Sequence, residues 1–154
     1  CRERISVTGF TDIQRAAMFY VLVKTGFGAS LRTFGCNKKR LNTDNFADIE
    51  ARLDGVVIEN KDFEDLIKVY DREKALFYCD PPYHKTERHY TVKFTEDDHE
   101  RLCRVLHQIK GRFVLSYNDD KYVRDLYKDY NIQAVTRNNS LSSGDFKEVI
   151  ITNF

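Results

Sequence analysis

The sequence predicts an α/β domain with a mostly parallel sheet. From Gly55 to the end of the 154-residue chain, short apolar runs typical of strands alternate with amphipathic stretches typical of helices. Such alternation is the pattern of strand–helix–strand units, in which neighbouring strands run parallel. The last two predicted strands, 132–136 and 147–152, are joined by a connection without a helical pattern. We therefore expect these two strands to pair antiparallel.

Two helices are predicted before Gly55. Thr11 and Gln14 have the spacing of a capping box and precede an apolar run that stops at Gly26, which predicts a buried helix over 11–25. A glycine-rich segment, 26–45, then indicates an exposed loop or short hairpin. The next stretch has helical spacing, with one apolar face formed by Phe46, Ile49 and Leu53.

The stretch "YVLVKTGFG" has a second interpretation, as a strand that enters a G-x-G turn. Asp44 or Asp48 would then be the acid that binds a ribose. The capping box and the alanines within the apolar run favour the helix, and a lone G-x-G is weak evidence.

The elements after Gly55 follow from the alternation of patterns. Strands are predicted over 56–59, 75–79 and 112–117, and helices over 62–70, 95–109 and 119–130. The last of these helices has apolar and aromatic residues at core spacing, namely Val123, Leu126, Tyr127 and Tyr130.

Composition excludes several classes of protein. The chain is 42% hydrophobic and carries 25 basic against 24 acidic residues, so it is too apolar for disorder and too balanced for a bulk polycation. The four cysteines are far apart and form no C-x-x-C pair, which predicts reduced thiols in a cytoplasmic protein. Its apolar runs are far shorter than the roughly 20 residues that span a bilayer, so we expect no membrane partner.

Both prolines of the chain lie together in "FYCDPPYHK". Asp80 follows the predicted strand 75–79, at the end of a sheet where α/β proteins bind ligands. Pro81 and Pro82 keep the backbone extended and have no N–H group, so this segment offers only oxygen acceptors. With the ring of Tyr83 beside them, these acceptors suit a flat substrate that bears an amino group, such as adenine. A plain turn at the end of a strand is the competing interpretation.

These residues resemble a known family. Asp80-Pro81-Pro82-Tyr83 matches the D-P-P-Y motif of amino-group methyltransferases, and the chain around it resembles Dam-type DNA adenine N6-methyltransferases. The similarity extends through "RAAMFYVLVKTGFGASLRTFG", "VVIENKDFEDLI", "FTEDDHERL", "FVLSYND" and "SLSSGDFKEVIITNF", which occur in the family's order. The resemblance implies a Rossmann-like fold that uses S-adenosylmethionine, with double-stranded DNA as partner and restriction-modification among the settings.

The resemblance also implies roles for individual residues. Asp80 and the carbonyl of Pro81 would accept hydrogen bonds from the amino group of a flipped-out adenine, with Pro82 keeping the motif rigid and Tyr83 stacking on the base. The cofactor would be bordered by Asp80 together with Asp62 and Phe63, and Ser116 and Asn118 would line the same cleft. Segment 26–45 would recognise the target, and its phosphate contacts would come from Arg32, Lys38, Lys39 and Arg40.

Other polar residues are less specific. His84, Lys85, Arg88, His89 and Tyr90 lie in the loop after the motif, and Arg137 and Ser140 lie between the last strands. His99 and His107 are about two helical turns apart, which is too far for one metal ion, and we expect no metal site.

In Dam-type enzymes a strand and an F-x-G-x-G loop precede all the segments quoted above. We therefore expect this chain to be the carboxyl-terminal part of a methyltransferase, with 55–154 as its catalytic part, that binds cofactor poorly alone. An incomplete sheet would invite self-association or a partner chain. Two alternatives stay open: a non-catalytic remnant or split subunit that binds DNA or a partner, and an RNA adenine methyltransferase.

Overall fold

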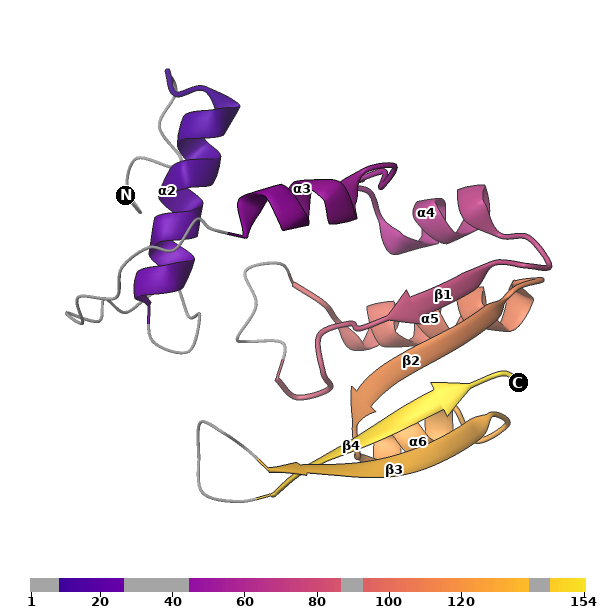
Figure 1. The fold of residues 1–154 in the computed structure, drawn as a ribbon. Helices are drawn as coiled ribbons and strands as arrows, with labels where there is room; N and C mark the ends of the chain where they lie inside the picture. Colours follow the sequence, from indigo (N-terminus) through magenta and orange to yellow (C-terminus); the bar gives the residue numbers. More distant parts are fainter. Residues whose placement is uncertain (1–8, 27–44, 87–92, 139–144) are drawn as a thin grey trace. The chain divides into compact units, whose positions relative to one another are not determined.

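The computed structural model describes residues 9–26, 45–86, 93–138 and 145–154. They belong to two compact units, Cys1–Ile58 and Glu59–Phe154, which are treated separately below (Figure 1). The predicted segment 26–45 lies almost wholly outside the described residues.

The first unit contains the two predicted helices, α2 (Asp12–Thr25) and α3 (Phe46–Leu53). The capping box is confirmed, since the Thr11 side chain accepts from the Gln14 backbone and the Gln14 side chain accepts from the Thr11 backbone. Burial of α2 was predicted and is wrong, because none of its side chains is buried. Its described neighbour is α3, which it meets through the edge-to-face rings of Tyr20 and Phe46, 5.2 Å apart, and this short helix covers little of its surface.

The predicted strand 56–59 does not form. Val57 and Ile58 are 73% and 80% exposed, so their β propensity is unused. A strand is stable only when its backbone N–H and C=O groups pair with a neighbouring strand, and no described residue pairs with this segment.

The second unit is a four-stranded sheet with three helices. Its strands are β1 (Leu76–Cys79), β2 (Arg112–Asn118), β3 (Asn131–Asn138) and β4 (Asp145–Thr152), in the order β1-β2-β4-β3. Its helices are α4 (Phe63–Tyr70), α5 (Glu96–Gln108) and α6 (Lys121–Leu126). The helix predicted over 119–130 is shorter than expected, because Asp120 caps its first turn by accepting from Tyr122 N and residues after Leu126 form turns.

The described sheet is mixed and not mostly parallel. β1 pairs with β2 in parallel, whereas β4 lies between β2 and β3 and is antiparallel to both. The predicted antiparallel pairing of the last two strands is confirmed. α5 and α6 lie behind the sheet in Figure 1, and the core forms there.

Alternation along β2 shows which face of the sheet is covered. Phe113, Leu115 and Tyr117 are fully buried, and helix residues Leu102, Leu106 and Val123 belong to the same apolar core. On the edge strand β1 of the described sheet, Leu76 and Tyr78 are 62% and 67% exposed. No helix in the described part of the chain is both long and apolar enough to cross a membrane.

Gly111 connects α5 to β2 at a point where two segments touch. A Cβ atom there would lie 2.7 Å from Ala75 O and 2.9 Å from Arg72 O, both backbone atoms. The Gly111 N–H donates to Asp71 Oδ1, and its carbonyl accepts from Asn153 Nδ2. The position therefore requires glycine for space.

We predict that Gly111→Ala lowers the free energy of unfolding by on the order of 1–3 kcal/mol, because β1 and β2 must shift apart to admit the methyl group. Urea unfolding followed by circular dichroism measures this change. An unchanged midpoint would contradict the requirement for close approach.

Candidate active site

The motif acid lies beside the end of a second strand. Cys79 pairs with Leu115 in the parallel register of β1 and β2, so Asp80 comes next to Ser116. The Ser116 hydroxyl donates to Asp80 Oδ1 at 3.0 Å and also lies 3.4 Å from the carbonyl oxygen of Cys79. Asp80 itself is exposed and Ser116 is buried. Ser116 on β2 thus holds one oxygen of the Asp80 carboxylate, and the carboxylate remains exposed to solvent.

Beside this carboxylate is a groove of about 410 Å³. Its wall combines the motif with α4, β1 and the start of α5, and the lining residues that matter here are Phe63, Leu66, Phe94, Asp80, Pro81 and Pro82. Most of this lining is aromatic or aliphatic, and Asp80 supplies the charge. A groove of this volume and chemistry suits a flat, partly apolar ligand that carries a polar or cationic group.

Tyr83 turns back toward the sheet from the end of the motif. Its half-buried ring lies 6.1 Å from that of Tyr117 at an interplanar angle of 41°, and its hydroxyl donates to Glu148 Oε1 at 3.2 Å. Burial raises the pKa of Tyr83 to about 12; a hydrogen bond with Ser116 opposes this rise, and the charges of Glu148 and Asp80 add to it. The phenol is therefore neutral at pH 7 and keeps its donor proton.

The residue after the motif anchors it to the core. His84 is 6% exposed, stacks on Tyr122 at 4.4 Å and has Nδ1 3.1 Å from Asp120 Oδ1. The Asn118 side chain donates to the His84 carbonyl at 3.2 Å. His84 belongs to the loop after the motif, and its ring is nevertheless buried. The loop turns inward because the end of β2 and the first turn of α6 offer it partners.

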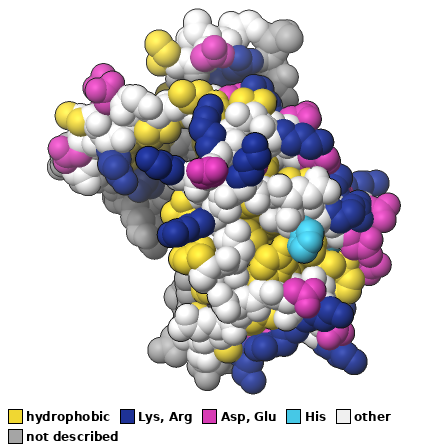
Figure 2. Space-filling model, turned by 90° about the vertical axis from the view of Figure 1, so that its right-hand side faces the viewer, with side chains coloured by type: hydrophobic (Ala, Val, Ile, Leu, Met, Phe, Trp, Pro, Cys, Tyr) yellow, Lys and Arg dark blue, Asp and Glu magenta, His cyan; other side chains and the backbone are white. Residues whose placement is uncertain are grey.

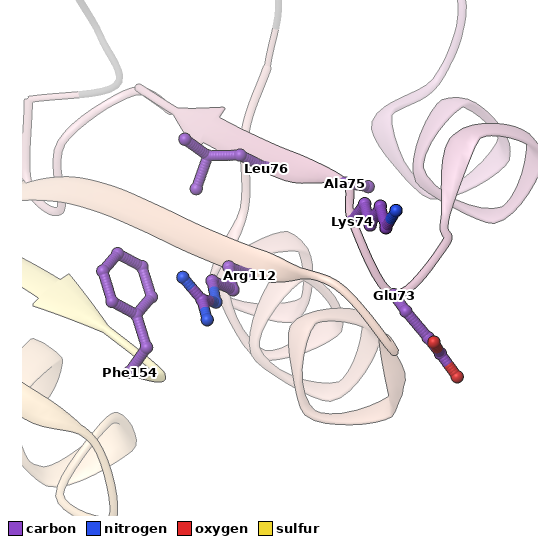
Figure 3. Close-up of a pocket in the computed structure, with 6 residues that line it drawn as sticks. All are labelled: Glu73, Lys74, Ala75, Leu76, Arg112 and Phe154. Atoms are coloured by element: carbon purple, nitrogen blue, oxygen red, sulfur yellow. The ribbon is translucent and has the colours of Figure 1, made fainter.

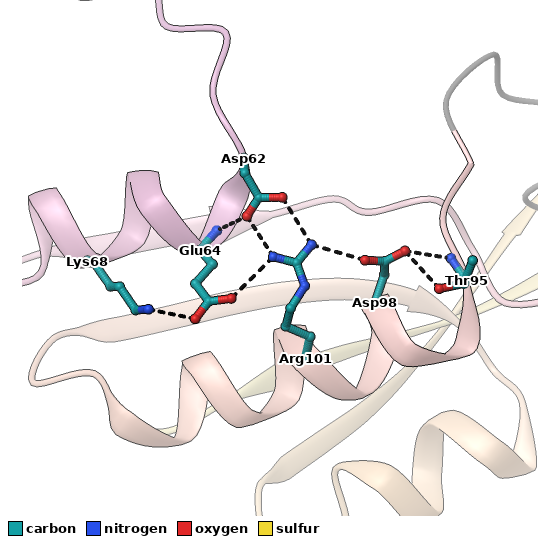
Figure 4. Close-up of polar contacts among 6 residues, drawn as sticks. All are labelled: Asp62, Glu64, Lys68, Thr95, Asp98 and Arg101. Carbon is teal, nitrogen blue, oxygen red and sulfur yellow. Dashed lines mark hydrogen bonds and ion pairs between the residues drawn. The ribbon is translucent and has the colours of Figure 1, made fainter.

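Asp62 and Phe63 lie at the start of α4, and their side chains have different partners. Figure 4 shows Asp62 with its polar partners. Phe63 lines the groove. Both Asp62 oxygens accept from Arg101 of α5, at 2.7 and 3.0 Å, and the same carboxylate caps the helix by accepting from Glu64 N. The Arg101 guanidinium also lies 4.1 Å from the centre of the Phe63 ring. Asp62 thus positions the start of α4.

Two further acids complete the set around Arg101. Asp98 and Glu64 accept from it at 3.0 and 3.2 Å, and Lys68 donates to Glu64 at 2.6 Å. Hydrogen bonds from Arg101 lower the pKa of Asp62. The pKa of Asp98 is lowered mainly by a hydrogen bond from the Thr95 backbone and also by hydrogen bonding with Arg101. This cluster ties α4 to α5 next to the groove.

A second groove, of about 500 Å³, lies at the opposite end of β1 (Figure 3). Leu76 and Arg112 begin the paired strands β1 and β2, and the Arg112 guanidinium lies 5.2 Å from the centre of the Phe154 ring. Ligands of open α/β sheets collect at the carboxyl ends of strands, which is where Asp80 lies. The groove beside the motif is therefore the candidate site.

The basic residues predicted to contact DNA lie outside the described residues: Arg32, Lys38, Lys39 and Arg40. Arg88, His89, Tyr90 and Ser140 are also outside the described part. On the face seen in Figure 2, Lys and Arg alternate with Asp and Glu, with apolar side chains between them. Within the described ranges no three histidine, cysteine or acidic side chains are grouped as metal ligands.

Two site residues escaped the sequence analysis. Glu148 directly precedes the apolar run "VII" of β4 and is only 7% exposed; an acid beside such a run was the available signal. Arg101 lies in the quoted stretch "FTEDDHERL", where the sequence pattern predicts only a helix.

Residues 11–141 match the model of the D12 class N6 adenine-specific DNA methyltransferases. The match includes the whole D-P-P-Y segment, the first turn of α4 and the end of β2, which are the parts that form the candidate site.

Arg101→Met is predicted to lower the free energy of unfolding by about 1 kcal/mol at pH 7, because partly exposed ion pairs contribute modestly. The pKa values of Asp62 and Asp98 are lowered in the folded protein, so the stability they contribute is present above their ordinary values and is lost as pH falls through the lowered ones. The difference in the free energy of unfolding between the variant and the parent should therefore shrink below about pH 4.

Urea unfolding at a series of pH values measures this difference. Arg104→Met is the matched control, because Arg104 lies on the same helix, is 63% exposed and meets only Glu100, at 3.6 Å, among its described ion-pair partners. If the Arg101 variant lost the same free energy of unfolding at every pH, packing on Phe63, and not the ion pairs, would be what stabilises this junction.

Proposed function

This chain belongs to the D12 class N6 adenine-specific DNA methyltransferases, and we propose that it transfers a methyl group from S-adenosylmethionine to N6 of an adenine in double-stranded DNA. The observation that carries the proposal is the acceptor array of Asp80 and Pro81 at the carboxyl end of β1, in which Asp80 is exposed to solvent. Ser116 holds this array from the sheet side, and the apolar groove lies next to it.

The array addresses the main difficulty of N6 methylation. In adenine the N6 lone pair is conjugated with the ring, so the amino nitrogen is a poor nucleophile. Asp80 Oδ1 accepts from Ser116, which leaves Asp80 Oδ2 and the Pro81 carbonyl for the two amino hydrogens. Holding both hydrogens on one side turns the lone pair toward the methyl donor, so alignment and electrostatics supply the catalysis.

The groove fits the proposed cofactor. Phe63, Phe94 and the proline rings offer flat apolar surface for an adenosyl group, and the Asp80 carboxylate offers a negative charge to a sulfonium. When bound, S-adenosylmethionine supplies an electrophilic methyl group. Asp62 would act here indirectly, since its oxygens are engaged by Arg101 and its effect is to place Phe63.

Tyr83 would contact the target base. A base inside a duplex cannot reach the groove, so the enzyme has to extrude it and hold it by stacking and hydrogen bonds. The ring of Tyr83 is half-buried and fixed by its hydroxyl, which leaves part of its surface open to a partner. In this scheme Pro82 supplies rigidity between the acceptor array and the ring.

Asp80→Ala should reduce methyl transfer by about a hundredfold or more, because it removes a preorganised acceptor. Incorporation of label from S-adenosylmethionine into an adenine-containing duplex measures the rate. Asp125→Asn serves as control, since Asp125 is an exposed acid on α6 and should retain parental activity. Equal rates for the Asp80 variant and the parent would rule out the proposed chemistry.

Lys38→Ala combined with Lys39→Ala should weaken DNA binding similarly for all sequences and reduce the slope of log K against log salt by about 2. Fluorescence anisotropy with a labelled duplex at several salt concentrations gives this slope. Lys128→Ala, an exposed lysine in the second unit, should leave it unchanged. A slope that stays at the parental value would remove these lysines from the DNA interface.

A further inference from the structure

Glu148 is a buried acid directly behind the candidate site. It is 7% exposed, whereas acidic side chains are almost never buried without a polar partner. Its carboxylate accepts the hydroxyl hydrogen bond of Tyr83 at 3.2 Å. Glu148 directly precedes Val149 and Ile151, whose side chains belong to the core, so a buried acid at this position requires a reason.

Strand pairing brings Glu148 to the same end of the sheet as the motif. In the antiparallel register Asn118 lies opposite Glu148, and Ser116 lies opposite Ile150. Side chains two residues apart on a strand share one face, so Glu148, Asn118 and Ser116 are neighbours on one face. Antiparallel β4 thus adds a carboxylate at the carboxyl end of β2.

Two hydroxyl groups meet at this point, those of Tyr83 and Ser116, and each has one O–H. The Tyr83 hydroxyl donates to Glu148 and the Ser116 hydroxyl donates to Asp80 Oδ1. The Ser116 side chain also lies within hydrogen-bonding reach of Tyr83. The remaining acceptor capacity of Asp80 faces solvent and is available to a substrate amine.

We propose that Glu148 is a positioning residue for the methyl transfer: by accepting the Tyr83 hydroxyl it fixes the angle of the ring and keeps the phenol proton away from Asp80. This role rests on the proposed function. Without the Glu148 carboxylate, the Tyr83 hydroxyl turns toward the Ser116–Asp80 pair and occupies an oxygen that the adenine amino group needs. The burial that keeps Tyr83 protonated makes this competition persistent.

The proposed role of Glu148 predicts a specific result for a double variant. Glu148→Leu removes the acceptor and leaves a competing hydroxyl. Tyr83→Phe removes that hydroxyl and retains the ring, so the double variant has no proton to misdirect. If Glu148 acts through Tyr83, the double variant should be more active than Glu148→Leu alone, which is the reverse of additivity.

The experiment compares kcat and KM for the full-length protein and four variants: Glu148→Gln, Glu148→Leu, Tyr83→Phe and the Tyr83→Phe/Glu148→Leu double variant. Glu148→Leu should lower kcat by about tenfold to a hundredfold, as misplacement of a reacting group does, with KM for S-adenosylmethionine within about twofold of the parent. Glu148→Gln retains an acceptor oxygen and should keep kcat within about threefold. The double variant should recover several-fold over Glu148→Leu.

Thermal unfolding of each variant separates a loss of folding from a loss of positioning. A parental kcat in Glu148→Leu, or a double variant no more active than Glu148→Leu, overturns the inference and leaves the proposed function intact. A tenfold loss in Glu148→Gln at a parental unfolding temperature also overturns it, and this result does not depend on whether the leucine variant folds. A full-length parent that transfers no methyl group overturns the proposed function and this inference with it.

Discussion

The parallel pairing of β1 with β2 is the constraint on which the candidate site depends. Its register places Cys79 opposite Leu115, so the next residue on each strand, Asp80 and Ser116, meet through a 3.0 Å hydrogen bond. A shift of one residue would reverse the face of every side chain on β1 and separate this pair. The core behind β2 resists such a shift, because Phe113, Leu115 and Tyr117 are fully buried against it, and Gly111 allows β2 to begin beside Ala75.

Around this pair, hydrogen bonds from three directions restrain the motif. Ser116 holds Asp80, Glu148 holds Tyr83, and Asp120 and Asn118 hold His84. On the other side of the groove, Arg101 holds the first turn of α4 and thereby Phe63. The two prolines restrict the backbone between these anchors. Such preorganisation matters for a reaction in which the protein mainly aligns an amine with a methyl donor.

Predictions that depend on residues close together in the sequence are confirmed. The capping box of Thr11 and Gln14 forms as its spacing predicts, α4 and α5 begin within one residue of their predicted starts, and the final strands pair antiparallel. Two predictions that needed a neighbour failed: the run 56–59 has strand-forming residues without a described pairing partner, and α2 is apolar without being buried. In both cases the residue types favour strand pairing or burial, and each of these requires a second segment of the chain.

The sequence by itself determined the chemistry of the motif. An acid, two residues without N–H groups and an aromatic ring at the end of a strand define an acceptor array whatever surrounds it, and they lie within the stretch that matches the family. Tertiary structure decided which groups support that array. The partners of Tyr83, His84 and Asp62 are Glu148, Asp120 and Arg101, which lie 65, 36 and 39 residues further along the chain. Hydrogen bonds depend on distances of about 3 Å, and only the pairing of strands and the packing of helices bring residues so far apart in sequence within that range.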